Sequence, residues 1–255
     1  MAKQRLKLVI PGSHGLNIAA VLETPELEPK AYVLYAHCFT CGKDNMAASR
    51  VSRGLVAQGF AVMRLDFGGI GASEGEFADT NFSSNVQNLK DCSDYLREHY
   101  QAPSLLIGHS FGGAAVLATA GDIKEVVGVV TIAAPSNPRH VCKQFLDHID
   151  TIEANGEALV SLSGRPFTIK KQFLDDLAVQ NQDEKIKRLK KPLLIFHSPL
   201  DQTVLIKEAE HIYNTAMHPK SFVSLDTADH LLTKAKDAQY VSASIGAWVS
   251  LYLEG

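Results

Sequence analysis

Short apolar runs alternate with amphipathic segments along most of this chain. The runs are typical of strands that are buried on both faces of a sheet. Between them, apolar residues recur at helical spacing, for example at Phe82, Val86 and Leu89. The strand-like runs are 6–10, 17–22, 31–36, 60–65, 105–107, 126–132, 192–197 and 220–225. Such alternation of strand and helix predicts an α/β fold with a mostly parallel sheet.

Turn residues refine this pattern. Residues 11–15, Pro-Gly-Ser-His-Gly, separate the first two runs and predict a hairpin, so the sheet opens with an antiparallel pair. Gly59 is expected to end the helix that precedes the run 60–65. Asp79 and Thr80 are candidates to cap the helix that begins near Phe82. The glycine-rich stretch 66–75 predicts a tight loop, since it has neither G-x-G-x-x-G nor a Walker lysine.

The regular pattern stops at 133–138. Residues 139–191 are more charged, favour helices and contain no strong strand pattern, and the sheet pattern resumes at 192. An excursion of this length within a compact domain is usually functional. We therefore expect residues 1–255 to form a single domain, with a cap over the active site inserted at about 139–191.

Composition narrows the class of protein. The chain has 255 residues, of which 45% are hydrophobic and 21% charged, and its net charge is −3. These values are ordinary for a globular domain, and no basic stripe suggests a nucleic-acid partner. The first apolar run stops at Pro11, too soon for a signal peptide, and no run is long enough to span a membrane. We expect a cytoplasmic protein.

The four cysteines are Cys38, Cys41, Cys92 and Cys142. They are few for a chain of this size and do not suggest a disulfide framework. Cys38 and Cys41 match the C-x-x-C spacing of redox sites, but we expect them to act as small residues that pack a tight loop. No second Cys/His pair has zinc-finger spacing, so no metal site is expected.

The chemically most informative stretch is 105–115, Leu-Leu-Ile-Gly-His-Ser-Phe-Gly-Gly-Ala-Ala. An apolar strand meets G-x-S-x-G, and small residues then open a helix. This is the strand, sharp turn and helix of a nucleophile elbow. Ser110 is therefore the candidate nucleophile, and Gly108 and Gly112 give the backbone the room it needs.

A serine hydroxyl needs a base, and that base needs an acid to orient it. His230 is the preferred base because it follows the last strand, at the same carboxyl edge of the sheet as Ser110. His109 is held beside the nucleophile and is a poor candidate. Asp201 follows the preceding strand and is the preferred acid. Asp226 and Asp229 are the alternatives.

Acyl transfer also needs donors for the oxyanion. The N–H of the residue after the nucleophile, Phe111, should supply one of them. The loop after the third strand should supply the other, and Phe39 is the candidate there. The order Ser110, Asp201, His230 along the chain is the order found in α/β-hydrolases.

Six motifs carry a resemblance to a known family. They are 37–41, 65–75, 108–113, 164–168, 197–201 and 228–230. In these motifs the chain resembles α/β-hydrolases of the serine aminopeptidase-like group, and especially hydrolase domains that occur fused to an OsmC-like domain. The resemblance implies an eight-stranded, mostly parallel sheet flanked by helices, with a helical cap. His37-Cys38 stands where the family usually has His-Gly. No OsmC-like region follows in this sequence, so a protein that stands alone and a piece of a longer one are both open.

These observations predict a cofactor-independent serine hydrolase, first of all a carboxylesterase that cleaves small-molecule acyl esters through an acyl-enzyme. No metal is expected to take part. Peptidase, thioesterase and perhydrolase activities use the same residues and are alternatives. A non-catalytic accessory module is a further alternative. Phe145, Phe167 and Phe173 of the cap are candidate substrate-binding residues.

Overall fold

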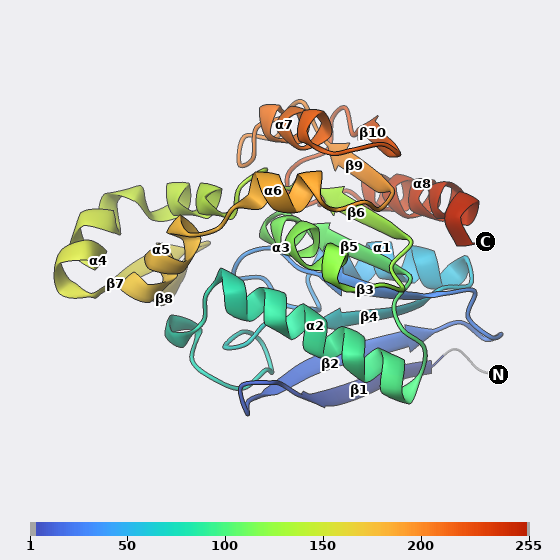
Figure 1. The fold of residues 1–255 in the computed structure, drawn as a ribbon, viewed down its shortest axis with the longest axis horizontal. Coiled ribbons are helices and arrows are strands. Elements are labelled where there is room, and N and C mark those ends of the chain that lie inside the picture. The colour runs from blue at the N-terminus through green and yellow to red at the C-terminus, as the bar shows by residue number, and fades with distance from the viewer. Residues whose placement is uncertain (1–3, 254–255) are drawn as a thin grey trace.

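Eight strands form one twisted sheet in the order β1-β2-β4-β3-β5-β6-β9-β10 (Figure 1). The computed structural model describes residues 4–253, and residues 1–3 and 254–255 lie outside the described residues. The strands are β1 Gln4–Pro11, β2 Asn17–Thr24, β3 Tyr32–Ala36, β4 Ala61–Leu65, β5 Leu105–His109, β6 Gly128–Ile132, β9 Leu193–His197 and β10 Lys220–Ser224. Among the described residues of this eight-stranded sheet, only the β1–β2 and β2–β4 pairs are antiparallel. The predicted mostly parallel sheet and its opening hairpin are confirmed.

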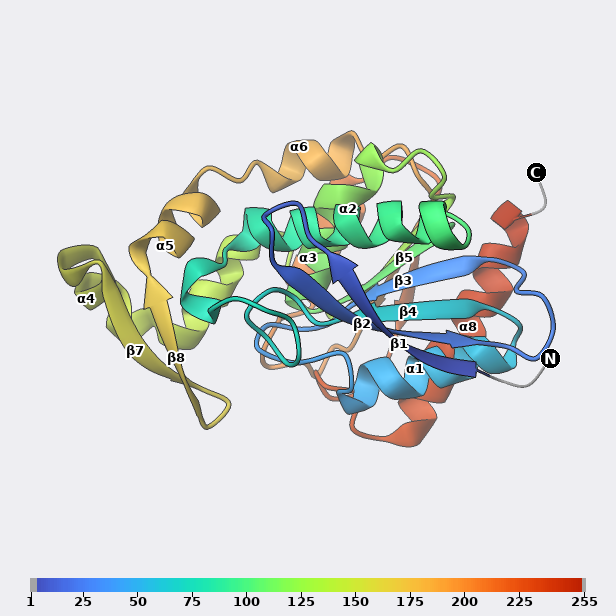
Figure 2. The same cartoon turned by 90° about the horizontal axis from the view of Figure 1, so that it is seen from below.

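Helices cover both faces of this sheet (Figure 2). Helices α1 (Met46–Ala57) and α8 (Ala235–Leu253) pack together on one face. Helices α2 (Phe82–His99), α3 (Phe111–Thr119) and α7 (Lys207–Thr215) contribute to the core on the other face. Alternate residues of the central strands β3, β4, β5, β6 and β9 face these two cores; Val33 belongs to one and Leu34 to the other. This is why the strands read as continuous apolar runs.

The helix ends agree with the sequence at one place and differ at another. Gly59, at φ 97°, follows the end of α1 as predicted. Helix α2 is capped by Asn81, not by Asp79 or Thr80, and Asn81 forms a reciprocal capping box with Ser84. The prediction was wrong because a short 3-10 helix, η1 (Phe77–Asp79), occupies these positions, and the Thr80 hydroxyl donates to the Phe77 carbonyl.

Most of the segment between β6 and β9 forms a lobe at one end of the molecule (Figure 1). The lobe consists of η3 Pro138–His148, α4 Ile149–Asn155, β7 Glu157–Leu162, β8 Arg165–Lys170 and α5 Lys171–Ala178. Helix α6 Gln182–Lys187 then leads back to the sheet and packs against α3 and α7, and a further 3-10 helix, η2 Ala120–Asp122, precedes β6. The expected helices are present, but the expectation that the insertion contains no strong strand was wrong, because β7 and β8 pair within it. Buried and exposed residues alternate along β7, and the two-residue turn at Ser163 and Gly164 has φ of 50° and 76°. These features produce a hairpin.

The lobe is hydrogen-bonded to the segment that leads into α2. The Gln172 amide donates to the carbonyl oxygens of Ala78 and Thr80, at 3.2 Å and 2.8 Å. The Asn81 amide in turn donates to the Gln172 side chain at 2.7 Å. Gln172 therefore ties α5 to the residues just before α2. In the described part of the chain, no helix has the length and apolar character that crossing a bilayer requires.

Candidate active site

Ser110 lies in the sharp turn between β5 and α3, at φ 54° and ψ −123°. A positive φ is uncommon for a residue with a side chain and persists only where the surroundings enforce it. The Ser110 N–H donates to the Ile132 carbonyl at 2.8 Å, and the Ser110 carbonyl accepts the Gly113 N–H at 2.8 Å. The stretch therefore has the strand, strained turn and helix that its sequence predicts.

Two glycines let the backbone close around this turn. A Cβ at Gly108 would lie 2.2 Å from the Gly112 carbonyl oxygen. A Cβ at Gly112 would lie 2.4 Å from the carbonyl oxygen of His37. Because the opposing atoms belong to the backbone, no rotamer change relieves these contacts. Gly112 thus lets the loop after β3 pack directly against the turn that carries Ser110.

The structure brings Ser110, His230 and Asp201 together from three separate loops. His230 Nε2 lies 2.9 Å from Ser110 Oγ, and His230 Nδ1 lies 2.7 Å from Asp201 Oδ2. A carboxylate only accepts hydrogen bonds, so Nδ1 carries the proton and donates to Asp201. Nε2 is then free to accept the Ser110 hydroxyl. This is the arrangement that turns a serine hydroxyl into a nucleophile.

Asp201 is 2% exposed and is held by backbone donors as well as by His230. Its Oδ1 accepts the N–H groups of Thr203 at 2.8 Å and Val204 at 2.9 Å. Burial alone would raise the pKa of Asp201, but these hydrogen bonds and the one from His230 outweigh it, so the pKa lies below its ordinary value. Of the alternative acids, Asp226 bonds to Ser224 and Asp229 caps the turn 229–233.

His109 has a role that the sequence did not suggest. Its ring is fully buried, and its Nε2 lies 2.7 Å from the His230 carbonyl oxygen, to which it donates. Burial, reinforced by the nearby His230, lowers the pKa of His109 to about 4, so the ring is neutral at pH 7. His109 thereby holds the loop that carries His230. The G-H-S motif placed it next to Ser110, but nothing in the sequence showed that its side chain points to residue 230.

A second histidine shapes the loop that contains Phe39. His37 Nδ1 donates to the Cys38 carbonyl at 2.8 Å, and its Nε2 accepts the Phe67 N–H at 3.2 Å. Burial lowers the pKa of His37, which favours the neutral ring, and these two hydrogen bonds select its tautomer. The Cys38 carbonyl and the Phe39 N–H belong to one peptide unit, so His37 fixes the direction of both. Within residues 4–253, neither the Phe39 nor the Phe111 N–H meets an acceptor.

Cys38 and Cys41 form a disulfide, which corrects the expectation that they only pack the loop. The Cys41 N–H also donates to the Cys38 carbonyl at 3.1 Å, so the C-x-x-C spacing forms a tight turn. Such a turn brings the two side chains to the same side, within disulfide range. Cys92 and Cys142 are free and buried. From the lobe, Arg165 Nη2 donates to the Thr40 carbonyl inside this turn.

Phenylalanine side chains from the lobe, from the loop after β3 and from η1, α2 and α3 meet beside the turn. The three predicted substrate-binding residues all belong to this group: Phe173 lies 5.7 Å from the Phe39 ring, Phe145 lies 6.4 Å from Phe173, and Phe167 lies 4.7 Å from Phe77. We call the whole group the aromatic cluster; its members are Phe39, Phe77, Phe82, Phe111, Phe145, Phe167 and Phe173. A small cavity of about 10 Å³, partly open to the surface, is bordered there by Phe39, Phe111 and Phe173. It is no larger than one water molecule requires.

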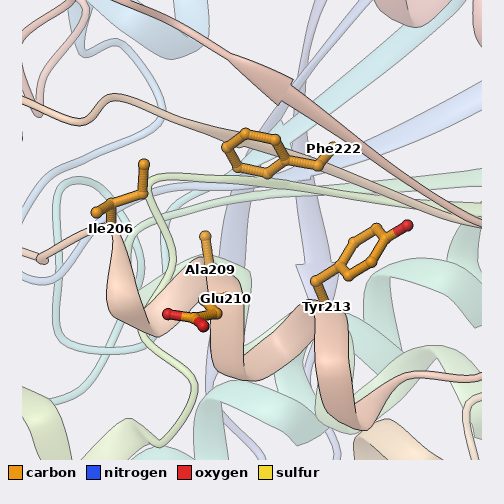
Figure 3. Close-up of a pocket in the computed structure, with 5 residues that line it drawn as sticks. All are labelled: Ile206, Ala209, Glu210, Tyr213 and Phe222. Carbon is orange, nitrogen blue, oxygen red and sulfur yellow. The ribbon is translucent and has the colours of Figure 1, made fainter.

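A much larger cavity lies away from these residues. It has a volume of about 490 Å³ and is lined by Ile206, Ala209, Glu210, Tyr213 and Phe222 (Figure 3). These residues belong to α7, the turn before it and the edge strand β10. None of the predicted site residues lines this cavity. In the part of the chain that the structure describes, no group of three or more His, Cys, Asp or Glu residues is arranged to hold a metal ion.

Comparisons with known proteins bear on the fold and the family. The esterase domain of a Rhodothermus marinus protein is 45% identical, with a TM-score of 0.79, over 98% of this chain and 99% of that chain. Est1E from Butyrivibrio proteoclasticus with ferulic acid bound has a TM-score of 0.82 at 18% identity, over 97% of this chain and 100% of that chain. At that identity the likeness shows the fold alone. No curated protein matches this chain.

A protein-family model described as serine aminopeptidase, S33, matches residues 28–160, just over half of the chain. This range contains Phe39, Ser110 and Phe111 and ends before Asp201 and His230. The likeness to domains fused to an OsmC-like domain stays a prediction. The family match and the 45% identity over 98% of the chain show that this protein belongs to the serine aminopeptidase S33 family of α/β-hydrolases.

Proposed function

We propose that this hydrolase is a serine-dependent carboxylesterase that acts on small acyl esters. The observation that carries the proposal is the unbroken hydrogen-bond path from Ser110 Oγ through His230 to Asp201, with distances of 2.9 Å and 2.7 Å. The 45% identity to an esterase domain supports an ester as the substrate.

In the proposed reaction, Ser110 Oγ attacks the ester carbonyl while His230 Nε2 takes the hydroxyl proton. Asp201 holds the imidazole in its tautomer and stabilises the imidazolium that forms. The Phe39 and Phe111 N–H groups donate to the oxyanion, each contributing roughly 2.7 to 4 kcal/mol to the lowering of the barrier. His230 then protonates the leaving alcohol. Water, activated by the same histidine, releases the acyl group and regenerates Ser110.

The packing of the aromatic cluster supports an ester substrate with a short acyl chain. Phe173 packs on Phe39, Phe145 on Phe173 and Phe167 on Phe77, so aromatic side chains fill the space beside Phe39 and leave a cavity of only about 10 Å³. We propose that the chain is a single domain in which the insertion at about 139–191 acts as a cap and supplies this wall. The hydrogen bond from Arg165 to Thr40 and the packing of Phe173 on Phe39 support the cap role.

The description of the matching family favours aminoacyl amides as a second class of substrate. Thioesters and perhydrolysis use the same chemistry, and a non-catalytic module is the alternative of another class. A panel of esters, thioesters and aminoacyl amides separates them. The expected cytoplasmic location stays a prediction.

The direct test is hydrolysis of a p-nitrophenyl acetate and butyrate pair by the wild type and by Ser110→Ala. We expect the variant to lose at least about 10³-fold in kcat because the nucleophile is absent. Ser250→Ala, at an exposed position on α8 far along the chain from the site, is the matched control and should retain full activity. Turnover by Ser110→Ala at the wild-type rate, with both variants folded by circular dichroism, would refute the proposal.

A further inference from the structure

The Cys38–Cys41 disulfide closes the turn that contains Phe39, the proposed oxyanion donor. The two Cα atoms lie 5.3 Å apart, and the Cys41 N–H donates to the Cys38 carbonyl at 3.1 Å. One covalent bond and one hydrogen bond thus join the same two residues. The peptide between Cys38 and Phe39 lies inside this closed ring, so its orientation depends on both.

The middle of the turn is strained. Thr40 has φ 57°, in the left-handed region. A β-branched residue is an outlier there, and such a conformation persists only where surrounding bonds enforce it. The disulfide on one side and Arg165, which donates to the Thr40 carbonyl, on the other are the restraints. Breaking the disulfide removes the stronger of the two and lets Thr40 relax.

The two cysteines differ in exposure. Cys38 is 4% exposed and follows the buried end of β3, whereas Cys41 is partly exposed and precedes Gly42. Two thiols need more room than a bonded sulfur pair. Because Cys38 is enclosed, the extra room has to come from movement of residues 39–41. A reductant in solution reaches the disulfide from the Cys41 side.

We propose that Cys38 and Cys41 form a thiol–disulfide exchange site that takes a dithiol reductant and controls the position of the Phe39 N–H. A reductant thiolate attacks Cys41 Sγ, the Cys38–Cys41 bond breaks, and the Cys38 thiolate leaves and takes a proton. The second reductant thiol then displaces Cys41, which is protonated in turn. Two electrons pass to the protein, and the reductant becomes a disulfide.

The expected consequence rests on the proposed esterase function. A donor in an oxyanion hole works only at 2.7–3.1 Å from the developing charge, and a displacement of about 1 Å is costly, so we expect reduction to lower kcat about tenfold. KM should change less, since ground-state binding does not need this donor. In a reducing compartment, such as the expected cytoplasm, disulfides are usually transient or redox-sensing.

The experiment compares the oxidised and the dithiothreitol-reduced wild type, and then the protein reoxidised by air. Alkylation after denaturation should add two groups to the oxidised protein, from Cys92 and Cys142, and four to the reduced one. We expect kcat to fall on reduction and to return on reoxidation. Full reduction, seen as four added groups, with kcat unchanged within twofold or increased would overturn the proposal.

Two double variants show which pair of cysteines causes the change in kcat. Cys38→Ser/Cys41→Ser should have the low kcat of the reduced protein and not respond to dithiothreitol, whereas Cys92→Ala/Cys142→Ala should respond as the wild type does. A response of the serine variant equal to that of the wild type contradicts the assignment. Amide hydrogen exchange at residues 39–41 should accelerate on reduction, whether or not esters are hydrolysed. This readout separates failure of the exchange site from failure of the esterase function, and unchanged exchange overturns the proposal.

Discussion

The turn at Ser110 and the loop 37–41 face each other across Gly112, but they are held in different ways. The Ser110 turn is fixed by backbone packing: Gly108 and Gly112 approach carbonyl oxygens too closely for any side chain. The loop is fixed by side chains, through the His37 ring, the Cys38–Cys41 disulfide and Arg165.

This difference indicates which contacts of the site can be removed without loss of the local fold. Backbone contacts of the kind made at Gly112 are either present or lost with the local fold. The restraints on the loop are separate bonds, and each can be removed while the sheet and the Ser110 turn persist. Changes on the Ser110 side should therefore be large and affect folding and activity together, whereas changes on the loop side should be smaller and affect activity first.

The largest effect is expected from Gly112→Ala. Its Cβ would lie 2.4 Å from the His37 carbonyl oxygen and 2.5 Å from that of Ala36. Since both opposing atoms are backbone, we expect the free energy of unfolding to fall by about 3 kcal/mol or more and ester hydrolysis to fall with it. Urea unfolding and kcat measure the two effects.

Gly121→Ala is the matched control for that variant. The nearest atom to its Cβ would be the Arg188 carbonyl oxygen at 3.9 Å, an ordinary contact. We expect stability to be unchanged or slightly raised, since alanine restricts the unfolded chain. If Gly112→Ala is as stable and as active as Gly121→Ala, close backbone packing at Gly112 does not fix the Ser110 turn.

The second largest effect is expected in the dependence of folding stability on pH. Burial, together with the nearby His230, lowers the pKa of His109 to about 4, below the value of about 6.5 in an unfolded chain. The unfolded state therefore binds this proton first, and stability should be lost as pH falls from about 6.5 to about 4, by up to about 3 kcal/mol from this residue. Urea unfolding at several pH values measures the slope.

His109→Gln sharpens this measurement because its amide can still donate to the His230 carbonyl but does not titrate. We expect a shallower acid slope for the variant than for the wild type. The slope should not vanish, because burial also lowers the pKa values of His37 and His197. Parallel stability curves for the two proteins would show that His109 is not buried in its neutral form.

The smallest effect is expected from Arg165→Ala, on the loop side. It removes the donor to the Thr40 carbonyl, but Arg165 is exposed, so we expect a loss of about 0.5 to 1 kcal/mol, a two- to fivefold fall in kcat, with stability nearly unchanged. Arg188→Ala, whose side chain is 81% exposed at the end of α6, is the control. Equal activity of the two variants would remove Arg165 from the restraints on the loop.

The sequence predicted the Ser110 turn, which is held by backbone packing, better than the loop 37–41, which is held by side chains. Strand order along the chain, the Gly59 helix end and the glycines around Ser110 follow from local pattern, because each requires particular residues at fixed spacing. The hairpin of the lobe left only the turn dipeptide Ser163-Gly164 as a local signal, because 158–160 are all apolar and their alternation appears only in the burial of the folded chain.

Local sequence patterns could not predict contacts between residues that are far apart in the chain. His109 donates to residue 230, and Arg165 donates to residue 40. Neither partner is encoded by spacing, since both depend on how the loops at the carboxyl edge of the sheet fold over one another. The C-x-x-C spacing is compatible with a Cys38–Cys41 disulfide, but the small number of cysteines did not suggest one.

The most direct test of the central claim is to react the folded wild type with a fluorophosphonate and locate the adduct by peptide mass spectrometry. We expect one adduct per chain, on the peptide that contains Ser110, and none in His230→Ala, because an unactivated serine does not react. An unmodified Ser110 in folded wild-type protein, or an adduct on another serine, would contradict the central claim.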